Sequence, residues 1–193
     1  MLSNAEITDI FKVTGTFMEG HFRLSSGLHS ALYIEKFRVL EHPQYTEILC
    51  RELAARFLGE GVTVVVGPAV GGVIIAYEVA RHLKARSIFC EREENTMALR
   101  RGFSLLPLDR VLVVEDIVTT GGSAKEVLEV VARSGASICG VGLLVDRSNG
   151  RVNLGHRTEA LLSMDTTTYD PSSCPLCQQG LPLVKPGSKQ LSL

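Results

Sequence analysis

Two adjacent carboxylates followed by small hydroxyl and glycine residues form the segment of the chain best suited to chemistry. The acidic pair, Glu115 and Asp116, follows the apolar run 111–114. Directly after the pair and two further apolar residues come Thr119, Thr120, Gly121, Gly122 and Ser123. Their backbone amides can surround a phosphate, their hydroxyls can donate further hydrogen bonds, and the helix expected next adds its positive N-terminal end. The segment therefore predicts a phosphate-binding turn.

The acidic pair indicates a sugar phosphate rather than a free phosphate. Carboxylates close to a bound phosphate would repel it, whereas one ribose length away they can accept hydrogen bonds from a vicinal diol. The segment has neither the lysine of a P-loop nor the spacing of a dinucleotide-binding G-x-G-x-x-G turn, so both classes are disfavoured. The alternative is a plain Gly-Gly turn beside a solvated strand end. That alternative does not explain why an apolar strand, an acidic pair, a turn of small residues and a helix follow one another in this order.

A second glycine-rich turn follows the apolar run 62–66. It contains Ala69, Val70, Gly71 and Gly72, and a strand-to-helix turn of this kind can present backbone amides to an anion. A connection without a ligand is the alternative. Two anion-binding turns on one sheet would suit a substrate that carries a phosphate at each end.

Several arginines could bind further negative charge. Arg92, Arg100 and Arg101 lie in a polar segment, 92–102, without a clear period, which is typical of a mobile basic lid or of a plain solvated loop. Arg147 follows the apolar run 138–145, where its guanidinium fork suits a carboxylate or carbonyl edge, unless it is an ordinary surface arginine.

Alternating strand and helix patterns must position these residues. Ser3 and Glu6 have capping-box spacing at the start of a short helix, and 21–24 with 31–34 predict a hairpin. The predicted strands are 62–66, 87–90, 111–114, 138–145 and an edge strand at 161–164, and the predicted helices are 43–57, 73–83 and 123–133. This order predicts an α/β fold with a mostly parallel central sheet and helices on both faces.

Length and composition limit the class of protein. The chain has 193 residues, which suits a single domain, 1–193, with an N-terminal hairpin part (1–40), an α/β core (43–165) and a loosely packed extension (166–193). Its 20 basic and 21 acidic residues give a formal charge of -1, so we expect no nucleic-acid partner. Without an apolar run of membrane length or a secretion signal, we expect no membrane partner and a cytoplasmic location.

The five cysteines are odd in number, which disfavours a disulfide scaffold. Cys174 and Cys177 form a C-x-x-C in the extension that could be half of a zinc site or a redox pair. Because no second C-x-x-C and no nearby C-terminal histidine follows, we favour ordinary thiols in this place.

The segment 111–123 resembles the ribose-phosphate signature of the type I phosphoribosyltransferases, and nearly the whole chain resembles the orotate phosphoribosyltransferases. The segments that carry the second resemblance are 22–30, 67–72, 91–93, 99–103 and 145–147. The resemblance implies the type I fold, with a small N-terminal hood beside the core. It also implies transfer of a phosphoribosyl group from phosphoribosyl diphosphate to orotate, which yields orotidine 5-phosphate and pyrophosphate in pyrimidine biosynthesis.

The resemblance also implies a role for each site residue. Glu115 and Asp116 would hold the ribose diol, the turn from Thr119 to Ser123 the 5-phosphate, and the turn from Ala69 to Gly72 the diphosphate. Arg92 and Arg100 would stabilise the leaving group, while Ser26, Gly27 and Arg147 would contact the base, and Thr120 lies near the ribose in relatives. Magnesium would be held through the substrate, without a metal ligand from the protein. A homodimer is expected, in which the lid 92–102 reaches the partner's site.

Three positions depart from relatives, which have lysine where this chain has Ser25, Gly71 and Thr96. The arginines would then carry more of the charge stabilisation. Two other functions stay open: a purine phosphoribosyltransferase, and a regulator that binds phosphoribosyl diphosphate on the same fold without turning it over.

Overall fold

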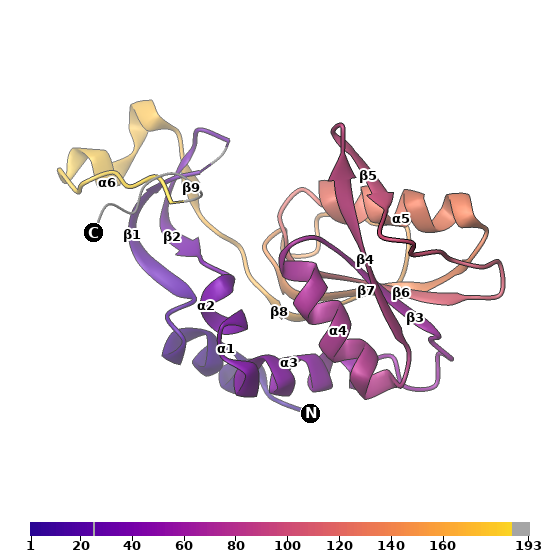
Figure 1. Ribbon diagram of the computed structural model, residues 1–193. Helices are drawn as coiled ribbons and strands as arrows, with labels where there is room; N and C mark the ends of the chain where they lie inside the picture. The colour runs from indigo at the N-terminus through magenta and orange to yellow at the C-terminus, as the bar shows by residue number, and fades with distance from the viewer. Residues whose placement is uncertain (25, 187–193) are drawn as a thin grey trace.

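A six-stranded sheet forms the centre of the computed structural model, which describes residues 1–24 and 26–186 (Figure 1). Its strand order is β5-β4-β3-β6-β7-β8. The strands are β3 (Val64–Pro68), β4 (Arg86–Glu93), β5 (Thr96–Leu99), β6 (Arg110–Val118), β7 (Ser137–Asp146) and β8 (Thr158–Ser163). All neighbours are parallel except β4 and β5, which confirms the predicted mostly parallel α/β sheet.

Helices cover both faces of this sheet because its central strands are apolar on both sides. On one face lie α1 (Asn4–Val13), α2 (Phe37–Leu40), α3 (Pro43–Ala55) and α4 (Gly71–Leu83), and on the other lies α5 (Gly122–Ser134). Within β6, Leu112 and Val114 pack toward α3 and α4, whereas Val111 and Val113 pack toward α5. Each central strand is therefore anchored in two hydrophobic clusters, and its carboxyl end is held firmly in place.

The predicted N-terminal helix is confirmed, together with its capping box. The Ser3 hydroxyl accepts from the Glu6 amide at 3.3 Å, and the Glu6 carboxylate accepts from the Ser3 amide at 2.8 Å. Ile7 and Phe11 of this helix are buried in the same cluster as α3 and α4.

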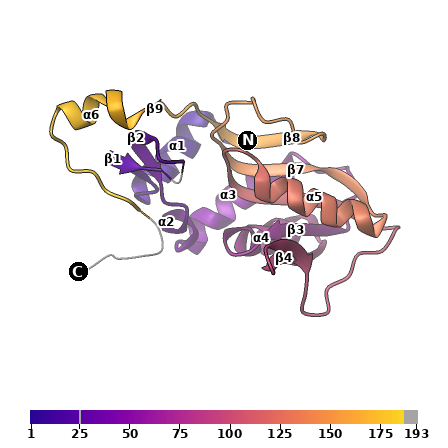
Figure 2. The same cartoon turned by 90° about the horizontal axis from the view of Figure 1, so that it is seen from above.

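A second, three-stranded sheet stands beside the core, as the view from above shows (Figure 2). We call it the hood sheet. It consists of β1 (Phe17–Arg23), β2 (His29–Ile34) and β9 (Thr168–Tyr169), all antiparallel, in the order β1-β2-β9. The predicted hairpin of residues 21–34 is thus confirmed.

The described part of the C-terminal extension contacts the hood sheet, although most of its residues are exposed. After β9 come a 3-10 turn (Pro171–Ser173) and α6 (Pro175–Gln178). Farther on, the Val184 amide donates to the His21 carbonyl and the Val184 carbonyl accepts from the Arg23 amide, both at 2.8 Å. Strand-like backbone pairing holds the extension, and such pairing needs no apolar periodicity. Residues 187–193 of the predicted extension lie outside the described part.

No helix in the described ranges combines the length and the apolar character that crossing a membrane requires.

Candidate active site

A cavity of about 260 Å³ opens at the carboxyl end of β6, and we call it the β6 cavity. It is lined by Lys36, Arg92, Glu126 and the continuous stretch from Glu115 to Ala124. The acidic pair and all five residues of the predicted phosphate-binding turn are among them. The carboxyl ends of parallel strands are where open α/β sheets bind ligands, and the location agrees with the sequence prediction.

The phosphate-binding turn is shaped by Gly121, which begins α5 in a left-handed conformation with φ of 77°. A Cβ atom at this position would lie 2.7 Å from Val152 Cγ1, so glycine is required both for the backbone angle and for space. Thr119 and Thr120 are exposed toward solvent, and α5 is long enough, at 13 residues, to present a positive N-terminal end to an anion.

The acidic pair is buried at the bottom of the cavity, with Glu115 6% and Asp116 2% exposed. Asp116 accepts from the Ile117 amide at 2.7 Å and forms an ion pair with Lys36 at 2.8 Å between Nζ and Oδ2. Burial, reinforced by repulsion from Asp116, raises the pKa of Glu115 to about 8. Near neutral pH the pair therefore carries less than two negative charges, and Lys36 compensates for part of what remains.

Sequence reasoning missed Lys36. It lies between β2 and α2, far from the glycine-rich turns in the sequence, and no local pattern distinguishes it from a surface lysine. Only the fold brings it to the end of β6.

The second glycine-rich turn borders the acidic pair from the neighbouring strand, β3. A Cβ atom at Gly71 would lie 1.9 Å from Asp116 Oδ2 and 3.6 Å from Lys36 Cδ. Any side chain at position 71 would therefore displace the Asp116 carboxylate, and the Lys36 side chain already lies in this space. Ala69 and Val70 are exposed, and Ala69 donates its amide to the Cys90 carbonyl at 2.7 Å. This turn adjoins the acidic pair but does not line the β6 cavity itself.

The predicted lid, 92–102, is largely a β-hairpin rather than an irregular loop. Glu93 pairs with Thr96 across a two-residue turn, Glu94-Asn95, in which both residues have positive φ. Met97 and Leu99 pack on the cluster under α5. This alternation spans only four residues, so the surrounding charged residues hid it in the sequence.

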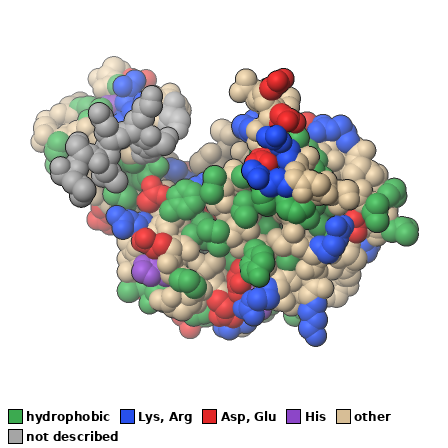
Figure 3. All heavy atoms as spheres, in the orientation of Figure 1, with side chains coloured by type: hydrophobic (Ala, Val, Ile, Leu, Met, Phe, Trp, Pro, Cys, Tyr) green, Lys and Arg blue, Asp and Glu red, His purple; other side chains and the backbone are tan. Residues whose placement is uncertain are grey.

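The arginines of this hairpin are placed differently. Arg92 lines the β6 cavity and pairs with Glu126 at 2.9 Å. Arg100 does not line it, and instead pairs with Glu93 at 3.3 Å, while Arg101 pairs with Glu91 at 3.0 Å. Charged side chains of both signs gather on this hairpin, across a notch from the hood sheet (Figure 3).

The predicted base-contacting residues lie on the hood side. Ser26 and Gly27 form the turn between β1 and β2, where Gly27 has φ of 86° and donates its amide to the Leu24 carbonyl at 2.9 Å. Arg147 follows β7, is half-buried, and donates from Nε to Thr166 Oγ1 at 3.2 Å. None of the three lines the β6 cavity. Ser25 lies outside the described residues.

Asp146, just before Arg147, is a further residue that sequence reasoning missed. Its buried carboxylate accepts from the Ser148 amide, the Ser148 hydroxyl and the Gly150 amide at 2.7 to 2.8 Å. These bonds fix the loop that carries Val152 against Gly121, so Asp146 supports the phosphate-binding turn from behind.

Comparison with known proteins agrees with this geometry. The family described as "Phosphoribosyl transferase domain" matches residues 39–156. Orotate phosphoribosyltransferase from Desulforamulus reducens is 59% identical over 191 residues, which cover 99% of this chain and 100% of that protein. The enzyme of the same name from Thermotoga maritima is 52% identical over 185 residues, which cover 96% of this chain and 99% of that protein.

Solved structures show the same fold. The crystal structure of orotate phosphoribosyltransferase from Aeropyrum pernix superposes with a TM-score of 0.67 at 26% identity, covering 82% of this chain and 93% of that one. A phosphoribosyltransferase from Corynebacterium diphtheriae gives a TM-score of 0.70 at 21% identity, covering 83% and 95%, and shows the fold alone.

The fold, the paired turns and the family match together define the class: the chain belongs to the phosphoribosyltransferase family. Within that class it belongs to the orotate phosphoribosyltransferases, because relatives of that name match it at up to 59% identity over nearly its full length.

Proposed function

We propose that the β6 cavity catalyses transfer of a phosphoribosyl group from phosphoribosyl diphosphate to N1 of orotate. The bond from the anomeric carbon to the diphosphate oxygen breaks, the bond to the base nitrogen forms as N1 gives up its proton, and pyrophosphate leaves. The observation that carries the proposal is the acidic pair enclosed between two glycine-rich turns on neighbouring strands, β3 and β6. One substrate with a ribose between two phosphate ends matches that order of groups.

Each group of residues binds a different part of the substrate. Thr119 to Ser123 and the start of α5 bind the 5-phosphate, and Glu115 and Asp116 accept hydrogen bonds from the ribose hydroxyls. The turn from Ala69 to Gly72 binds the diphosphate through the amides of Val70, Gly71 and Gly72, because the Ala69 amide already donates to the Cys90 carbonyl. Arg92, which already lines the cavity, stabilises the negative charge of the leaving group, and Lys36 adds a second cation beside Asp116. Catalysis then rests on positioning and charge stabilisation, without a protein nucleophile.

Magnesium fits this site through the substrate. The protein offers carboxylate oxygens of the kind that this ion prefers, but Asp116 is already paired with Lys36, so no set of protein ligands encloses an ion there. When bound with the substrate, magnesium would reduce the negative charge of the diphosphate. Glu115 and Asp116 would orient the ribose hydroxyls that face it.

The acceptor is bound from the hood side in this proposal. Ser26 and Gly27 present a polar turn to the base, and Arg147 contacts its carboxylate or carbonyl edge. A location in the cytoplasm, where pyrimidine biosynthesis would supply orotate, is part of the same proposal.

The decisive experiment offers the protein phosphoribosyl diphosphate, magnesium and one of orotate, adenine, guanine or uracil, and follows loss of the base. We expect turnover with orotate alone. Turnover only with a purine would reject the orotate assignment, and binding without turnover would favour a regulator. High identity to proteins named for orotate supports the first outcome.

A homodimer in which the 92–102 hairpin serves the partner's site explains why Arg100 does not line its own cavity. Mixing subunits tests this. Asp116→Asn and Arg100→Ala chains, each weakly active alone, should regain activity when unfolded and refolded together, because one site of the mixed dimer then has both residues intact. Activity equal to the average of the separate variants would show that each chain uses its own Arg100.

A further inference from the structure

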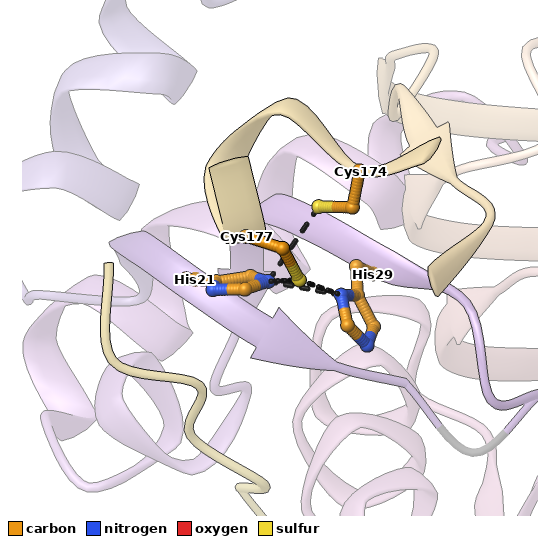
Figure 4. Close-up of side chains that lie close together, drawn as sticks. All are labelled: His21, His29, Cys174 and Cys177. Carbon is orange, nitrogen blue, oxygen red and sulfur yellow. Dashed lines mark hydrogen bonds between the residues drawn. The ribbon is translucent and has the colours of Figure 1, made fainter. Parts of the chain in front are cut away.

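Four side chains that commonly bind metals meet in the hood sheet, away from the β6 cavity. They are His21 of β1, His29 of β2, Cys174 directly before α6, and Cys177 within α6 (Figure 4). One nitrogen or sulfur atom from each lies within 4.8 Å of the others. His21, His29 and Cys174 are 3%, 4% and 1% exposed, so these polar atoms have left water, and only Cys177 reaches the surface.

The distances agree with a tetrahedral metal site. Cys177 Sγ lies 3.4 Å from His29 Nδ1 and 3.7 Å from His21 Nε2, and Cys174 Sγ lies 3.6 Å from His21 Nε2. With metal–nitrogen and metal–sulfur bonds of about 2.0 and 2.3 Å, a regular zinc tetrahedron separates nitrogen from sulfur by about 3.5 Å. The two nitrogens, His21 Nε2 and His29 Nδ1, are 2.9 Å apart, slightly closer than the roughly 3.3 Å of that tetrahedron. A small rotation of one ring makes up the difference.

The outer contact of His21 favours metal binding. Its Nδ1 lies 2.9 Å from the Leu181 carbonyl, an acceptor, so Nδ1 carries the proton and donates it there. Nε2, which points into the cluster, then has a free lone pair. A backbone carbonyl that fixes the tautomer in this way is the usual second contact of a metal-binding histidine.

We propose that His21, His29, Cys174 and Cys177 bind one zinc ion in a closed, structural site. Two thiolates and two imidazoles are the donor set that zinc prefers over harder ions such as magnesium. Four protein ligands complete the tetrahedron and leave no position for a substrate or water. The sequence interpretation of Cys174 and Cys177 as ordinary thiols considered only C-terminal histidines, whereas the two histidines come from the N-terminal hairpin.

The site would link the C-terminal extension to the β1–β2 hairpin, close to the turn that the proposed function assigns to base binding. The turn that contains Ser26 and Gly27 connects the two strands that carry His21 and His29. The hood sheet is small, with β9 contributing only two residue pairs to it. Small units with little apolar core commonly depend on a metal or a disulfide for order. Zinc would thus hold the turn, and its effect on the base rests on the proposed function of Ser26 and Gly27.

Metal content of the full-length protein tests the site directly. Protein produced in zinc-containing medium, purified with a phosphine reductant and analysed by inductively coupled plasma mass spectrometry, should contain about one zinc per chain. Replacing zinc by cobalt should give the intense visible bands and thiolate charge-transfer absorption of tetrahedral Co²⁺ bound to sulfur. A wild-type protein that neither retains zinc nor gives this cobalt spectrum would overturn the proposal, and its cluster would be hydrogen-bonded thiols and imidazoles.

Variants assign the ligands. The double variant Cys174→Ser with Cys177→Ser should lose the zinc, while Cys139→Ser, a matched control on β7 of the core sheet, should retain it. Zinc retained by the double variant would also overturn the proposal. If the double variant does not fold, the cobalt spectrum of the wild-type protein decides the question by itself.

Kinetics separate this inference from the function on which part of it rests. With zinc removed, we expect the KM for orotate to rise several-fold more than the KM for phosphoribosyl diphosphate. Equal changes in both constants, with zinc binding intact in the wild type, would reject the role of the metal in ordering the base-side turn. Zinc content does not depend on turnover, so an inactive protein that binds zinc would refute only the proposed function.

Discussion

The β6 cavity and the Cys/His cluster of the hood sheet are built in opposite ways. The cavity takes most of its lining from one continuous stretch, Glu115 to Ala124. The cluster instead joins two histidines, at positions 21 and 29, to two cysteines at positions 174 and 177. The cavity leaves open volume beside a buried acidic pair, but the cluster brings its four ligand atoms within 4.8 Å of one another. The first arrangement can accept and release a substrate, and the second can only enclose an ion.

The largest effect should come from Asp116→Asn, which tests whether the cavity works independently of the cluster. Asp116 is buried, pairs with Lys36 and faces the proposed ribose hydroxyls, so we expect kcat/KM for phosphoribosyl diphosphate to fall about 100-fold or more. Zinc content and circular dichroism should not change. Asp165→Asn, which removes an exposed partner of Arg151, serves as the control. Wild-type kinetics in Asp116→Asn would refute the role in binding the diol.

Gly71→Ala should have the next largest effect, because the added Cβ would lie 1.9 Å from Asp116 Oδ2. The carboxylate must move, so we expect about a tenfold loss of kcat/KM and a loss of about 1–3 kcal/mol in the free energy of unfolding. Urea unfolding and steady-state kinetics measure the two effects. Gly122→Ala, whose Cβ has no neighbour closer than 3.9 Å, should leave stability within about 0.5 kcal/mol of wild type. Equal destabilisation by both variants would contradict the crowding at Gly71.

Lys36→Met tests the cation that the hood side supplies to the cavity. Without the ammonium at 2.8 Å, Asp116 loses its partner and Glu115 loses an interaction that lowers its pKa. We expect the KM for phosphoribosyl diphosphate to change several-fold and the acid limb of the activity–pH profile to move to higher pH. Lys12→Met, on the surface helix α1, is the control. A pH profile identical to that of the wild type would show that Lys36 does not act on the acidic pair.

Glu115→Gln tests the acidic pair through the pH dependence of stability. The pKa of Glu115 is raised from its ordinary 4.5 to about 8 on folding, so its protonated form stabilises the folded state below pH 4.5. That contribution disappears progressively as the pH rises toward 8. Free energies of unfolding measured from pH 5 to 8 should therefore decline more steeply for the wild type than for Glu115→Gln. Parallel curves would mean that Glu115 is ionised in both states.

The same contrast explains how much the sequence could predict. Features coded by neighbouring residues were predictable: the capping box of Ser3 and Glu6, the apolar run of β6, and the glycine turn that leads into α5 at Gly121. Their physical causes act within a few residues. Lys36 and the pairing of Cys174 with His21 were not predictable, because each depends on which distant strands lie side by side.

The hairpin of β4 and β5 was only partly predictable from the sequence. Its two-residue turn with positive φ and its buried Met97 are local features, yet the charged residues around them favoured a loop. A strand of four residues offers too few alternations to outweigh that composition.

The pairing of Val184 with β1 makes the hood sheet depend on both ends of the described chain. The central sheet has all six strands once the ribosome has made Ser163, but the hood sheet needs β9 and the residues up to Val184. Every strand of the central sheet therefore precedes in the sequence the residues that complete the hood sheet. The N-terminal hairpin, although made earliest, waits longest for its last partners, and a chain cut after β8 would keep the central sheet but lack the strand that completes the hood.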